Sequence, residues 1–151
     1  MKKRHWLIII FAFIVCFIWG NSVLSSQLSS ALSMAVGEFF ASIFGTGDGV
    51  TTVGGLSVRK MAHFTEFAAL GAVASLLFKR FLKNKGIYAL GIALCGLFVA
   101  LMDETIQIFS NRGSSVRDVW IDILGYTVGC LTVAAICLAC TKLKNKNAHI
   151  E

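Results

Sequence analysis

Eleven polar side chains of the kinds used in catalysis and binding stand at the ends of three apolar segments of this 151-residue sequence. They form three groups: Arg59, Lys60, His63 and Glu66; Asp103, Glu104 and Gln107; and Arg112, Arg117, Asp118 and Asp122. Carboxylates and an imidazole can transfer protons, and the cations suit an anionic group because arginine binds phosphate or carboxylate through a two-pronged fork. The mixture indicates a site that binds an anion and moves protons.

The residue types divide the candidate site into two roles. His63 lies one turn from Glu66, a spacing that makes them a candidate proton-transfer pair. The candidate catalytic residues are His63, Glu66, Asp103, Glu104 and Asp118. The candidate ligand-binding residues are Arg59, Lys60, Gln107, Arg112, Arg117 and Asp122. A single histidine of this kind is more often structural, so a structural role for His63 stays open.

A divalent metal ion is a further alternative for the same cluster. Its ligands would come from His63, Glu66, Asp103, Glu104, Asp118 and Asp122. Magnesium or calcium would use the carboxylate oxygens, whereas zinc would also favour the imidazole. Since no tight ligand motif such as H-E-x-x-H occurs, a metal is not favoured, and the cofactor is left unassigned.

The elements that must position these groups are membrane-spanning helices. The chain is 56% hydrophobic and only 15% charged, and its mean hydropathy is +0.76, far from the mixture typical of soluble domains. A bilayer core takes about 20 apolar residues per helix. The sequence predicts an all-α, polytopic membrane protein with one domain over 1–151 and four spans, at about 6–24, 58–78, 87–109 and 118–140.

Three local features qualify this prediction. Apolar residues at helical spacing predict a helix over 28–44 that lies in the membrane interface, and the glycine-rich segment 45–55 follows as a loop. The first span resembles a signal peptide, but the poor cleavage site after it favours an uncleaved helix. Gly125 and Gly129 form a small-xxx-small pair that lets a neighbouring helix approach closely.

Positive charges predict the orientation of the spans. Ten of the 14 lysines and arginines stand at the N-terminus, between the second and third spans, and in the tail. The positive-inside rule therefore places both termini in the cytoplasm and the polar cluster at the outer leaflet. Because charges facing lipid cost about 2.5–3.5 kcal/mol each at the membrane centre, the cluster must face inward and pair.

A structural ion-pair network, in which Arg112 and Arg117 neutralise Asp103, Glu104 and Asp118, is the main alternative to a functional site. Function is favoured, because buried ion pairs rarely stabilise a protein more than apolar packing does. The net charge of +6 does not indicate nucleic acid here. The expected partners are membrane lipids or lipid-linked envelope precursors, and a homodimer through the Gly125 and Gly129 face stays open.

The charged groups also resemble the VanZ-like family of small bacterial membrane proteins. The resemblance covers about residues 59–130 and is carried by Lys60-x-x-His63-Phe64-x-Glu66-Phe67, Asp103-Glu104-x-x-Gln107-x-Phe109, Arg112, Asp118 and Gly125-x-x-x-Gly129. The chain departs from the family at Phe67, where tyrosine is frequent, and at Ser110-Asn111, where Pro-Gly is frequent. Neither departure removes a charged position.

The resemblance implies a multi-pass protein of the bacterial cytoplasmic membrane that lowers sensitivity to teicoplanin and related lipoglycopeptides, so that a glycopeptide antibiotic joins the candidate partners. Two function classes follow. The protein is an enzyme, then a hydrolase or transferase acting on an envelope lipid, or it is a non-catalytic binder of lipid or antibiotic. A transporter is disfavoured, because no polar path crosses the inner halves of the spans.

Overall fold

The computed structural model describes residues 2–23, 52–53, 56–110 and 115–147, with side chains for 5–23, 60–110 and 115–143. Its helices are α1 (Lys2–Val23), α3 (Val58–Phe81), α4 (Lys85–Phe109) and α5 (Val116–Asn147). Two-residue strands β1 (Thr52–Val53) and β2 (Leu56–Ser57) pair antiparallel just before α3. The predicted interfacial helix over 28–44 lies outside the described residues.

Four helices are long and apolar enough to cross a membrane: His5–Val23, Lys60–Phe81, Lys85–Phe109 and Val116–Leu143. These match the four predicted spans, so the all-α, polytopic fold class is confirmed. Large apolar side chains on the outside of the helices, such as Phe13, Phe98 and Leu131, are exposed in the isolated chain, as expected for surfaces that contact lipid.

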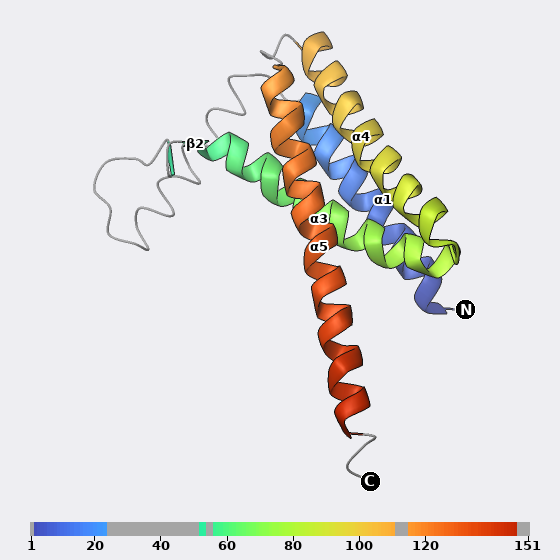
Figure 1. Ribbon diagram of the computed structural model, residues 1–151. Coiled ribbons are helices and arrows are strands. Elements are labelled where there is room, and N and C mark those ends of the chain that lie inside the picture. The colour runs from blue at the N-terminus through green and yellow to red at the C-terminus, as the bar shows by residue number, and fades with distance from the viewer. Residues whose placement is uncertain (1, 24–51, 54–55, 111–114, 148–151) are drawn as a thin grey trace.

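The helices alternate in direction along the bundle (Figure 1). As a result, α1 and α4 end where α3 and α5 begin. α3 crosses α5, and these two helices make the most extensive contact of any pair. A small core of Ile18, Phe67, Leu70, Val99 and Tyr126 joins all four helices. The alternation brings the predicted polar groups to one end of the bundle.

Three glycines allow α3 and α5 to approach closely. A Cβ atom on Gly125 would collide with the backbone carbonyl of Phe64, and one on Gly129 with that of Ala68. Gly71 of α3 faces the carbonyl of Tyr126 in the same way. The packing role of Gly125 and Gly129 is therefore confirmed within the chain, where their contacts are with α3. The homodimer that the sequence left open stays untested.

The ends of the helices beside the polar cluster are fixed by local hydrogen bonds. Ser115 precedes α5, and its hydroxyl accepts a hydrogen bond from the backbone N–H of Arg117 at 3.2 Å, while its carbonyl accepts one from Asp118 at 2.8 Å. Asp118 lies in the first turn, where a negative charge is favourable. These bonds begin α5 at Val116, two residues before the predicted start of the span.

Candidate functional site

The structure brings members of all three predicted groups together at one end of the bundle. α3 contributes Lys60, His63 and Glu66 from its first turns; α4 contributes Asp103, Glu104 and Gln107 from its last turns; and α5 contributes Asp118 and Asp122. The most deeply buried charged side chains are those of His63, Asp103, Glu104 and Asp122. Helices that are far apart in the sequence thus build one polar interior.

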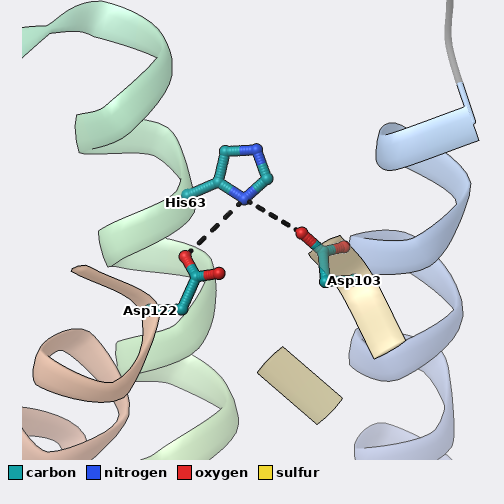
Figure 2. Close-up of side chains that lie close together, drawn as sticks. All are labelled: His63, Asp103 and Asp122. Atoms are coloured by element: carbon teal, nitrogen blue, oxygen red, sulfur yellow. Dashed lines mark ion pairs between the residues drawn. The ribbon is translucent and has the colours of Figure 1, made fainter. Parts of the chain in front are cut away.

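His63 lies at the centre of this interior. Its Nδ1 atom is 3.6 Å from Asp103 Oδ2 and 3.9 Å from Asp122 Oδ1. Figure 2 shows the imidazole of α3 between the two carboxylates, which reach it from α4 and α5. Only 8% of His63 is exposed, and the aspartates are 0% and 1% exposed. We call His63, Asp103 and Asp122 the polar centre.

Asp103 is held in place by two hydrogen bonds. Ser22 Oγ donates to its Oδ1 at 2.6 Å, and Gln107 Nε2 donates to its Oδ2 at 2.8 Å. Ser22 belongs to the last turn of α1 and is itself buried. The carboxylate therefore has a fixed orientation toward His63, because hydrogen bonds to a charged acceptor are short and directional.

A second pair of carboxylates lies beside the polar centre. Glu66 Oε1 accepts a hydrogen bond from Asn21 Nδ2 at 3.1 Å, and Glu104 Oε2 accepts one from the backbone N–H of Ser115 at 3.1 Å. The bond to Ser115 ties the end of α4 to the start of α5. The proton-transfer pairing of His63 with Glu66 stays a prediction.

Sequence reasoning missed the contribution of α1. Asn21 and Ser22 contact site carboxylates, although the charge pattern indicated polar groups on only three helices. The signal was present, since two adjacent amide and hydroxyl side chains follow an apolar run. Alternating topology places that end of α1 at the same depth as the charged groups.

The structure describes the side chains of only some of the predicted cations. Lys60 Nζ contacts Asp118 Oδ1 at 3.0 Å, at a partly exposed rim. Arg117 is exposed, and it makes no ion pair with the described carboxylates. The alternative structural network would require such a pair. Arg112 lies outside the described residues, and α3 includes Arg59 without describing its side chain.

The two aspartates of the polar centre are buried away from water. Asp103 and Asp122 each form an ion pair with His63. An ionised carboxylate away from water is costly unless it is paired or coordinates a metal ion. The arrangement can therefore hold protons, a cation, or both.

Fold and site together define a polytopic membrane protein with a polar centre enclosed at one end of a four-helix bundle. The chain belongs to the VanZ/LLP1 family, whose model matches residues 6–138. The match includes all four helices of the site, from Asn21 in α1 to Asp122 in α5. No match was found among curated proteins or among solved structures.

Proposed function

We propose that this chain is a cell-envelope protein that binds or modifies an anionic headgroup at the outer leaflet and thereby lowers sensitivity to teicoplanin and lipoglycopeptide antibiotics. The observation that carries the proposal is the polar centre, in which His63 Nδ1 lies within 4 Å of carboxylates from two other helices. The headgroup would belong to a membrane lipid or to a lipid-linked envelope precursor.

Burying the charged side chains of the polar centre costs free energy, and this cost supports a functional role over a structural one. A membrane bundle gains stability most simply from close packing, as α3 and α5 do through their glycines. Buried charges rarely add stability beyond an apolar replacement. Charged residues inside membrane segments are instead associated with binding and proton transfer.

The two parts of the cluster suggest different roles. Lys60, at the partly exposed rim, would contact the anionic headgroup together with the arginines predicted for this end. In an enzyme, His63 would accept a proton from the water or hydroxyl group that attacks the headgroup and would return it to the oxygen that leaves as its bond to the headgroup breaks. Asp103 would orient the imidazole. The reaction would be hydrolysis or group transfer on an envelope lipid.

The proposed orientation is that of a bacterial cytoplasmic membrane protein with both termini in the cytoplasm. Lys79, Arg80, Lys83 and Lys85 are all exposed where α3 ends and α4 begins, at the opposite end from the polar centre. An excess of lysine and arginine marks cytoplasmic connections. This distribution supports an outward-facing polar centre.

The test is antibiotic susceptibility in a sensitive Gram-positive host. Teicoplanin and a lipoglycopeptide would be tested against cells expressing wild type, His63→Ala, Glu66→Gln, Asp103→Asn or Arg112→Ala, with Lys83→Gln as a control from the opposite end. Immunoblots of membrane fractions would confirm equal levels. We expect wild type and Lys83→Gln to protect, and the variants of the polar end to lose protection.

Two outcomes would count against the proposal. Equal protection by His63→Ala and Asp103→Asn at wild-type membrane levels would make the cluster structural. A wild-type protein that gives no protection at all would remove the antibiotic role. In that case, comparison of envelope lipids with and without the protein would decide whether a headgroup is modified.

A non-catalytic binder is the second candidate function. Asp103 accepts hydrogen bonds from Ser22 and Gln107, and Glu104 accepts one from Ser115. Carboxylates held in fixed positions suit the binding of a ligand as well as catalysis. The two candidates differ in the effect of Asp103→Asn. Catalysis predicts lost protection with lipid or antibiotic binding retained in proteoliposomes, whereas a binder would lose both together.

A further inference from the structure

We propose that His63, Asp103 and Asp122 bind one divalent transition-metal ion inside the membrane bundle. The imidazole nitrogen and one oxygen of each aspartate lie within 4.8 Å of one another, and all three residues are buried. Each ligand comes from a different helix (Figure 2). The ion would therefore join α3, α4 and α5 at the polar end.

The two distances from His63 suit an ion that the imidazole shares with each aspartate. Bonds from zinc to histidine nitrogen or carboxylate oxygen are about 2.0–2.2 Å, so neighbouring ligand atoms lie roughly 3–4 Å apart. The two separations from His63 Nδ1 are 3.6 and 3.9 Å. These exceed hydrogen-bond length, but they match the spacing of atoms that share a metal ion.

The carboxylate of Asp122 is a second observation that points to a bound cation. Asp122 is 1% exposed, and neither of its oxygens accepts a hydrogen bond from the described residues. One of these oxygens is directed toward His63 Nδ1 (Figure 2). Because buried polar groups nearly always have a partner, a carboxylate in this state points to an ion or proton at the polar centre.

Asp103 has the surroundings expected of a metal ligand. Ser22 and Gln107 donate one hydrogen bond to each of its oxygens and so fix the direction of the carboxylate. Residues that orient ligands in this way usually change metal affinity by 10- to 100-fold when they are mutated. The bonds leave lone pairs on the carboxylate that can face the ion.

The ligand set also indicates the class of metal. Magnesium and calcium prefer ligand sets made of oxygen, whereas an imidazole beside carboxylates suits ions such as Zn²⁺ or Mn²⁺. Three protein ligands leave an open position for water or for a headgroup oxygen. The sequence did not favour a metal because these ligands are spread over three helices and form no local motif.

The metal site adds a chemical role to the proposed function. Only this role of the ion rests on the proposed function. A bound ion could polarise a headgroup oxygen or lower the cost of ionising a water molecule. Metal binding itself depends on the three side chains alone. Its test is therefore separate from antibiotic susceptibility, and either proposal can fail without the other.

The experiment measures metal binding by the full-length protein in detergent. Chelator-treated protein would be dialysed against Zn²⁺ and, separately, Mn²⁺, and bound metal would be counted by inductively coupled plasma mass spectrometry. The variants would be His63→Ala, Asp122→Asn and Ser22→Ala. Thr105→Ala is the matched control, since it removes an exposed hydroxyl next to Glu104 that bonds a carbonyl of its own helix. Size-exclusion profiles would exclude misfolded samples.

We expect about one ion of Zn²⁺ or Mn²⁺ per wild-type chain, and the same for Thr105→Ala. Affinity would fall at least tenfold in His63→Ala and Asp122→Asn, and about tenfold in Ser22→Ala. The ion should also raise the unfolding temperature of wild type but not of Asp122→Asn. Absence of bound metal, or equal binding by all variants, would overturn the proposal. Protons would then neutralise the buried carboxylates of the polar centre.

Discussion

The two ends of the bundle carry charge in opposite ways. At the polar end, His63, Asp103 and Asp122 are buried and meet across three helices. At the opposite end, Lys79 and Lys83 are exposed where α3 joins α4. A charge at the surface costs little, whereas a buried charge must be paired or neutralised. The basic end therefore suits orientation in the membrane, while the polar end suits a ligand.

Local polar contacts differ between the ends as well. Near the basic end, Ser75 and Tyr88 share a hydrogen bond of 2.9 Å, and a hollow beside them is lined by Lys79, Lys83 and Lys85. These lysines are exposed beside it. The polar end has the reverse arrangement, with its charges inside. Substitutions at the two ends should therefore have unequal effects.

The largest effect is expected where α3 and α5 hold the polar end together. Gly125→Val and Gly129→Val would each place a side chain against the backbone of α3. We expect each substitution to lower the free energy of unfolding by about 3 kcal/mol, which is near the largest loss typical of an overpacked core. The amount of protein in the membrane should fall as well. Thermal unfolding in detergent would measure it.

Gly20→Ala is the control for this prediction, because a Cβ atom there would meet nothing within 4 Å. It should leave the unfolding temperature unchanged. If Gly129→Val proved as stable as Gly20→Ala, the close contact of α3 with α5 would be wrong, and so would the placement of Asp122 beside His63.

A smaller effect is expected from Ser22→Ala. The change removes the hydroxyl that donates to the buried carboxylate of Asp103 at 2.6 Å. Loss of a hydrogen bond to a buried charged group costs about 2 kcal/mol. Thr132→Ala is the control, since its exposed hydroxyl only bonds a carbonyl of its own helix. Equal unfolding temperatures for the two variants would contradict the role of α1 in the site.

The ion pair at the rim should matter less. Lys60→Ala removes the contact with Asp118, whose side chain is 24% exposed beside a lysine that is 39% exposed. Exposed ion pairs contribute at most about 1 kcal/mol, and salt weakens them. Unfolding would be measured at low and high salt. A loss as large as that of Ser22→Ala would show that the rim is as buried as the polar centre.

The smallest effect on stability is expected at the basic end. Lys83→Gln and Lys85→Gln change exposed side chains, so unfolding free energy should stay within about 0.5 kcal/mol of wild type. Their effect would appear in orientation, read from cysteine labelling on each side of the membrane. A loss of about 2 kcal/mol in the free energy of unfolding would contradict the difference in stability proposed between the two ends.

Much of the fold was predictable because span length and apolar composition are strong signals. The span predicted at 87–109 agrees closely with α4 (Lys85–Phe109). α5 begins before and ends after its predicted span of 118–140, because Ser115 begins the helix early and the helix extends through Lys142 into the tail. Apolar content marks the part of a helix in lipid, not the part that projects from it.

The candidate site was only partly predictable. The distribution of lysines and arginines predicted that the three polar groups lie together on one side of the membrane. Which atoms meet depends on how each helix rotates and crosses its neighbours, so the approach of His63 to Asp103 and Asp122 needed the structure. Ser22 was missed because one hydroxyl at a helix end is a weak signal.

We claim that the polar centre is a working site, and Asp122→Asn decides whether this is correct. The substitution keeps the shape of the side chain and removes no hydrogen bond from the described residues. Thr105→Ala is the control, since it changes an exposed hydroxyl that bonds a carbonyl of its own helix. We predict that Asp122→Asn unfolds within about 1 kcal/mol of wild type yet loses teicoplanin protection, while Thr105→Ala keeps it. Full protection by Asp122→Asn at wild-type membrane levels would contradict the claim.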